Sequence, residues 1–158
     1  MADAIKPIKR SMQLTPLSRE HHEGLLFVWK IRQGIRYKIE PNRISHFCTW
    51  FWQHHLISHF QKEEEVLPRL LTSDHPMVQQ MMREHQQIKH QLETLQQGAD
   101  YNNLEHLAQL LYDHIRFEER QLFNEVEKRV APELLEKIAA GLEGEKNNAA
   151  WDDTFWLK

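Results

Sequence analysis

The chain has 158 residues and a formal charge of −3, from 20 Lys and Arg against 23 Asp and Glu. This length fits one domain, the single Cys excludes a disulfide framework or a cysteine-rich zinc site, and the charge balance argues against binding to nucleic acid. The 5 Gly and 6 Pro are too few for the many tight turns of a β-sandwich or β-barrel, so we expect an all-α protein. The chain also contains an unusually large number of histidines, 11 in all.

Residues 1–14 are predicted to form an N-terminal extension. They include basic residues but no apolar stretch of the roughly 7–15 residues that a signal peptide needs. No apolar run in the chain approaches the roughly 20 residues of a membrane span. We therefore expect a cytoplasmic protein that does not bind membranes.

Two long helices are predicted in the first half of the chain. Thr15 and Pro16 are typical of an N-cap and a first helical residue, and an apolar stripe continues from them to about Ile35. A second helix is predicted over Arg43–Leu71. Aromatic side chains of both helices are expected in the core: Trp29, Trp50, Phe51 and Trp52.

Two more long helices are predicted in the second half. Pro76 begins one of them and Gly98 ends it. Asn102 and Glu105 resemble a capping box that opens the next helix, which stops before Pro132. Short connections make consecutive helices antiparallel, so residues 15–130 are expected to form an up-down-up-down four-helix bundle.

Residues 131–158 are predicted to add a short helix and an aromatic tail. The helix is expected over Glu133–Ala140, and the tail carries Trp151, Phe155 and Trp156. Apolar side chains beyond a bundle need a surface to cover them. We expect the tail to pack on the bundle, and the alternative is a contact between two copies in a homodimer.

Histidines lie on the inward stripe of all four long helices: His21, His59, His85 and His114. A buried imidazole needs partners for both ring nitrogens, which four packed histidines do not easily find. Glu63 and Glu118 each follow one of these histidines by four residues, a spacing that places His and Glu on the same helix face.

The same short motifs occur twice. The frame His-x-x-x-Glu-Glu-x-x-Leu begins at both His59 and His114, and the triplet Arg-Glu-His ends at both His21 and His85. The chain is therefore a degenerate duplication of a helix pair. Four imidazoles and two carboxylates exceed one tetrahedral zinc site and suit two metals of octahedral preference, with both Glu bridging and one position open.

This order of residues resembles the hemerythrin-like (HHE cation-binding) domain family, in its bacterial form, over about residues 15–130. The resemblance implies a four-helix bundle that holds two non-haem iron ions joined by an oxo or hydroxo bridge. It also implies a binding protein rather than an enzyme. Its ligand would be dioxygen, nitric oxide or peroxide, and its role sensing, storage, detoxification or iron handling. The implied metal ligands are His21, His59, Glu63, His85, His114 and Glu118.

The chain departs from the oxygen-carrying members of that family at two points. Those proteins have a second histidine four residues after the first in the third helix, where this chain has Lys89. They also use a His-x-x-x-x-Asp pair in the last helix, where this chain offers Glu118 at four residues and Glu119 at five. The set is closer to hemerythrin-like proteins associated with redox chemistry, nitric oxide or iron handling.

Several alternatives remain open at this point. His22 competes with His21, His55 is an alternative extra ligand, and Glu119 competes with Glu118. Glu64 and Glu119 belong to acidic runs that are expected to be solvated. The other functions considered are a di-iron oxidoreductase, a haem protein and a metal-free helical interaction module. The remaining histidines are expected to be solvated or interhelical: His46, His54, His75, His90 and His106.

Overall fold

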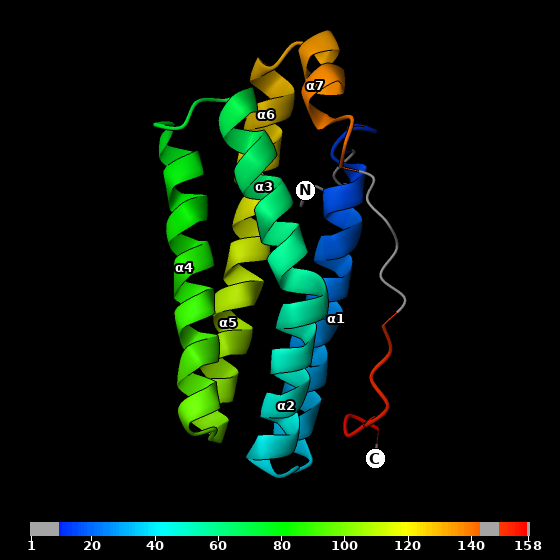
Figure 1. Cartoon of the computed structure of the whole chain (residues 1–158), viewed down its shortest axis with the longest axis vertical. Helices are drawn as coiled ribbons and strands as arrows, with labels where there is room; N and C mark the ends of the chain where they lie inside the picture. The colour runs from blue at the N-terminus through cyan, green and yellow to red at the C-terminus, as the bar shows by residue number, and fades with distance from the viewer. Residues whose placement is uncertain (1–9, 143–148, 158) are drawn as a thin grey trace, which may run out of the picture.

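The computed structural model describes residues 10–142 and 149–157, so the predicted extension is described only from Arg10, and residues 143–148 of the C-terminal part lie outside the description. Four long helical columns run antiparallel, as predicted, with short connections between them (Figure 1). The elements are α1 (Thr15–Arg36), α2 (Pro41–Phe51), η1 (Trp52–Leu56), α3 (Ile57–Leu70), α4 (Pro76–Gln97), α5 (Tyr101–Phe117), η2 (Glu118–Leu122), α6 (Phe123–Arg129) and α7 (Pro132–Ala139). No strand occurs among these described residues, which confirms the all-α class.

The second and fourth columns each contain a π-helical segment. In the second column η1 links α2 to α3 and ends just before His59, and in the fourth η2 links α5 to α6 and begins at Glu118. Such segments are rare and occur frequently at functional sites. The apolar periodicity did not predict them, because apolar residues at three- and four-residue steps do not show where a single extra residue is inserted.

Proline lies in the first turn of four helices, but two predicted N-caps are wrong. The hydroxyl of Thr15 donates to the carbonyl of Ser11 instead of capping α1. The fourth column begins at Tyr101, and its cap is Asp100, whose carboxylate accepts from the Asn103 N–H at 2.7 Å. The prolines in the first turns are Pro16, Pro41, Pro76 and Pro132.

The apolar core is divided into two clusters along the bundle axis. One is built around Phe27, Phe47 and Phe51, and the other around Leu67 and Phe123. A layer of buried His and Glu side chains lies between them, since each of the four columns passes from one cluster to the other across this layer. Trp29 was expected in the core but is 47% exposed.

The aromatic tail lies beside α1 (Figure 1), and its rings contact Phe47 and Trp50 of α2. The ring of Phe155 is buried, 5.4 Å from the ring of Phe47, and Gly34 gives it room, because a Cβ there would lie 2.8 Å from the Phe155 ring. Lys30 Nζ lies 4.1 Å from the centre of the Trp156 ring. The tail thus covers part of the core, and the homodimer contact stays a prediction. No helix in the described part of the chain is both long and apolar enough to span a bilayer.

We predict that Phe155→Ala lowers the free energy of unfolding by about 3 kcal/mol, because it empties a buried aromatic site. Urea unfolding followed by circular dichroism measures this change. Leu157→Ala is the matched control, since Leu157 is 63% exposed and should leave stability unchanged. Equal stability of the two variants would show that the tail does not contribute to the core.

Candidate metal centre

Six titratable side chains from the four columns face one another in the middle of the bundle. All are buried, and Glu63 and Glu118 have no exposed surface at all. They form two overlapping groups, in each of which one ligand atom per residue lies within 4.8 Å of the others. One group contains His21, His59, Glu63 and Glu118, and the other contains Glu63, His85, His114 and Glu118. The two glutamates belong to both groups.

The carboxylate of Glu63 lies between the two groups. Its Oε2 is 3.2 Å from His59 Nε2 and 3.4 Å from His21 Nε2, while its Oε1 is 3.0 Å from His85 Nε2. One oxygen therefore faces each group. A carboxylate in this place could help to hold a cation in each group.

Glu118 takes the corresponding place from the opposite column. Its Oε1 is 2.8 Å from His21 Nε2 and 3.1 Å from His114 Nε2, and its Oε2 is 4.0 Å from His85 Nε2. Each of its oxygens also lies near an imidazole of a different helix. The two carboxylates together connect all four histidines.

Four buried atoms in this cluster have no hydrogen-bond partner: His59 Nε2, Glu63 Oε2, His114 Nε2 and Glu118 Oε2. A buried polar atom without a partner costs about 1–3 kcal/mol, so each needs a ligand that hydrogen bonds within the cluster do not provide. Metal ions would satisfy all four. Imidazole nitrogens and carboxylate oxygens together suit iron and similar transition metals, so the residues fit a dimetal site.

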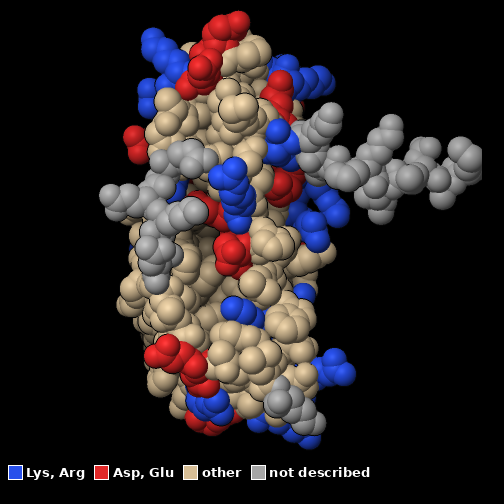
Figure 2. Space-filling view, turned by 90° about the vertical axis from the view of Figure 1, so that its right-hand side faces the viewer, with Lys and Arg blue, Asp and Glu red and all other residues tan. Residues whose placement is uncertain are grey.

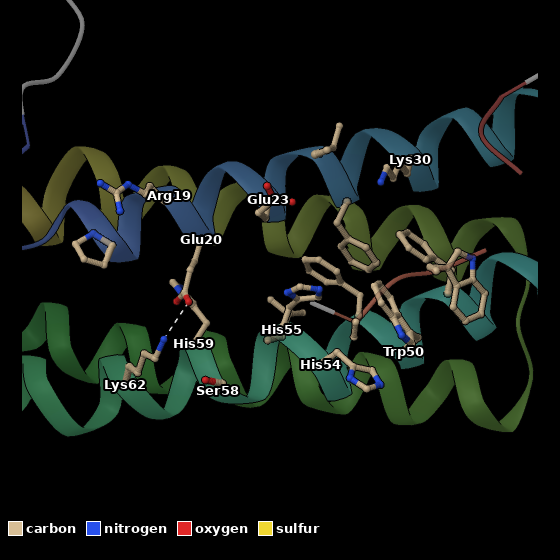
Figure 3. Close-up of a pocket in the computed structure, with 18 of the residues that line it drawn as sticks. Arg19, Glu20, Glu23, Lys30, Trp50, His54, His55, Ser58, His59 and Lys62 are labelled. Atoms are coloured by element: carbon tan, nitrogen blue, oxygen red, sulfur yellow. Dashed lines mark hydrogen bonds and ion pairs between the residues drawn. The ribbon is translucent and has the colours of Figure 1, made fainter. Parts of the chain in front are cut away.

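Each inward histidine is also held from outside by a second carboxylate. These contacts join Nδ1 to a carboxylate oxygen and measure 2.7–2.8 Å. With a metal bound, Nδ1–H would donate to that oxygen and the lone pair of Nε2 would be directed at the centre, as at most metal-binding histidines. The pairs are His21 with Glu119, His59 with Glu20, His85 with Glu64, and His114 with Glu84. Figure 3 shows Glu20 and His59 side by side.

These four outer glutamates form a closed ring around the bundle. Each lies next to an inner ligand in the sequence but bonds the histidine of another column: α1 to α3, α3 to α4, α4 to α5, and η2 back to α1. Glu64 and Glu119 were expected to be solvated, but each bonds a histidine, although the Glu64 side chain remains 37% exposed. The repeated motifs could have predicted this role, because all four outer glutamates belong to them. Glu20 and Glu84 are the middle residues of the two Arg-Glu-His triplets, and Glu64 and Glu119 are the second Glu of the two frames.

The pKa values of the cluster show how strongly its members interact. Burial alone would lower the pKa of His114, but the charge of Glu118 and hydrogen bonds to Glu118 and Glu84 raise it to about 10. Burial would raise the pKa of Glu63, but His59 and its neighbours hold it well below its usual range. Without a metal ion, protons on the histidines therefore balance the negative charge of the buried carboxylates, and metal binding must displace these protons.

The structure also shows where the alternative candidates for metal ligands lie. His22 is exposed, and His55 is half-buried and stacks on Phe51 at 4.8 Å, so neither lies in the two groups. Glu119 contacts His21 Nδ1 from outside, while Glu118 lies in the centre. His75, expected to be solvated or interhelical, caps α4 by accepting from the Met77 N–H at 3.1 Å.

Residues 13–126 match the family model described as the hemerythrin HHE cation binding domain. The match covers most of the chain and includes all six inner residues, so the chain belongs to this family. Comparisons with curated proteins and with solved structures found no match.

We predict that Glu84→Gln weakens the affinity for metal about 10–100-fold, because the neutral amide no longer fixes the charge and orientation of the His114 ring. Competition of ferrous iron with a coloured chelator measures the affinity. Glu93→Gln is the control, since Glu93 is an exposed residue of the same helix. Unchanged affinity in Glu84→Gln would show that the outer carboxylate does not act on the metal site.

Proposed function

We propose that this hemerythrin-family protein binds two non-haem iron ions and, at one of them, a small ligand such as dioxygen or nitric oxide. The observation that supports this most directly is the pair of overlapping groups that share Glu63 and Glu118. Each group supplies two imidazoles of its own, and the shared carboxylates hold the two positions together. Iron bound there would supply a Lewis-acidic, redox-active ion with room for an external ligand.

The residues around the centre favour binding over turnover. Each outer carboxylate holds an imidazole in one tautomer, and the apolar clusters above and below exclude bulk water. This arrangement suits reversible capture of a small molecule, as in sensing, storage or detoxification.

The competing functions explain fewer observations. Di-iron oxidoreductases of the ferritin type use Glu-x-x-His pairs, and no Glu of this chain is followed by His at that spacing. A haem between two histidines has no room where Nε2 atoms and carboxylates lie within 4.8 Å of one another. A metal-free interaction module leaves four buried polar atoms without partners.

We predict two irons per chain in the purified protein, measured by elemental analysis beside an absorption spectrum. Glu118→Ala should lose both irons, because Glu118 belongs to both groups, and His59→Ala should lose at least the iron of its own group. His90→Ala is the control, since His90 is exposed on α4 and lies outside both groups. Full iron content in Glu118→Ala would contradict the assignment, and a Soret band would replace it with haem binding.

Metal removal should also lower stability. At a free metal concentration 100 times the dissociation constant, binding adds about 2.7 kcal/mol to the free energy of unfolding. We therefore expect a chelator to lower the melting temperature of the wild-type protein and to have no effect on Glu118→Ala. Calorimetry with and without chelator measures this, and identical shifts in both proteins would contradict it.

A further inference from the structure

The two ligand groups match in their inner residues but differ in the charges outside them. The first group contains His21 and His59, and the second contains His85 and His114. Each of these four imidazoles contacts one outer glutamate through Nδ1. The charge of an outer glutamate acts on the metal site through this contact, so a cation that pairs with the glutamate also acts on the site.

Glu20 and Glu84 are outer glutamates at corresponding places in the two Arg-Glu-His triplets. Glu20 serves the first group, and its second oxygen lies 3.0 Å from Lys62 Nζ. Glu84 serves the second group, and its second oxygen accepts from the neutral amide of Gln80 at 2.8 Å. Two corresponding carboxylates are thus paired with a cation in the first group and with an uncharged donor in the second.

The other two outer glutamates show the same contrast. Glu119 serves the first group, and one of its oxygens lies 3.8 Å from Nη2 of the buried Arg10. Arg10 shares its charge with Glu127, whose carboxylate is 2.7 Å away. Glu64 serves the second group, and within residues 10–142 and 149–157 its ion pair is with its histidine alone. Cations therefore lie behind both outer glutamates of the first group.

The ion pair of Lys62 and Glu20 lies at one end of a pocket of about 950 Å³ between α1 and the column of α2, η1 and α3 (Figure 3). Of the four inward histidines, His59 lines this pocket. Figure 2 shows acidic and basic side chains in contact about midway along the bundle. Lys62 is 22% exposed, so water screens its charge less than it screens the charge of a fully exposed lysine.

We propose that Lys62, assisted by Arg10, makes the two metal positions unequal, so that the first group favours a ferrous ion and the second group a ferric ion. The inference rests on the proposed function, because it assumes an iron at each position. A nearby cation disfavours the ion of higher charge through Coulomb repulsion. One electron from an external reductant such as dithionite therefore reduces a ferric ion to a ferrous ion in the first group, and no bond of the chain forms or breaks.

Stepwise reduction of the iron-loaded, full-length protein by dithionite with redox mediators tests this inference. Electron paramagnetic resonance detects the half-reduced state, because this state alone has an odd number of iron d electrons. We expect two one-electron steps in the wild-type protein, the first of which belongs to the first group.

Lys62→Gln gives Glu20 the kind of partner that Glu84 has. We expect it to lower the potential of the first step by an amount that changes the ferrous-to-ferric ratio about threefold to tenfold, at most about 59 mV, and to leave the second step in place. Gln80→Lys is the converse change, since it gives Glu84 a cationic partner. It should raise the potential of the second step by a similar amount, so both variants reduce the largest population of the half-reduced state.

Two further variants separate charge from structure. Lys62→Arg keeps the positive charge beside Glu20 and should retain the wild-type potentials. Lys89→Gln removes the same charge from an exposed position on α4, one helical turn after His85 and outside the ion pairs of the outer glutamates, so it should move neither step appreciably.

Three results would overturn the inference in a protein that carries two irons. They are an unchanged first step in Lys62→Gln, equal shifts in Lys89→Gln, and a single two-electron step in the wild-type protein. Absence of iron from the wild-type protein would instead overturn the proposed function, so iron analysis of the same samples distinguishes the two failures.

Discussion

Two carboxylates with no exposed surface, Glu63 and Glu118, set the main constraint on this structure. A buried carboxylate is very costly unless cations or hydrogen-bond donors surround it. Four imidazoles from four columns converge on the pair, and the apolar core is divided to make room for them. The bundle therefore has its two stabilising clusters on either side of a polar layer that is incomplete without a counter-charge.

The outer carboxylates extend this constraint to the surface. Because each of them bonds a histidine from another column, the ring ties the four columns together at the same height. Each column supplies one histidine and one outer glutamate to the ring, so rotation of any one column would break two of these contacts. The geometry of the centre thus depends on the packing of the whole bundle, and the ring is the link between them.

The two halves of the chain share their ligand motifs but differ in the residues around them. Lys62 and Phe117 occupy corresponding places in the two frames, yet one borders a pocket and the other is buried. The residues that face the centre are of the same type in both halves, while the flanking residues differ with the surfaces that they meet. The two ligand groups therefore match, whereas the residues that surround them do not.

The sequence by itself determined the helical class, most helix starts and the candidate inner residues, with His22 and Glu119 left as alternatives to His21 and Glu118. These depend on local rules: proline in a first turn, apolar residues at helical spacing, and His and Glu one turn apart on one face. The tertiary structure alone decided that Glu118 rather than Glu119 faces the centre, that Glu64 and Glu119 hold histidines, and that His55 stacks on Phe51. It also decided where the tail packs and which half borders the pocket. These features depend on how far each helix is rotated against its neighbours, and that rotation results from packing between residues distant in the sequence, which no local pattern specifies.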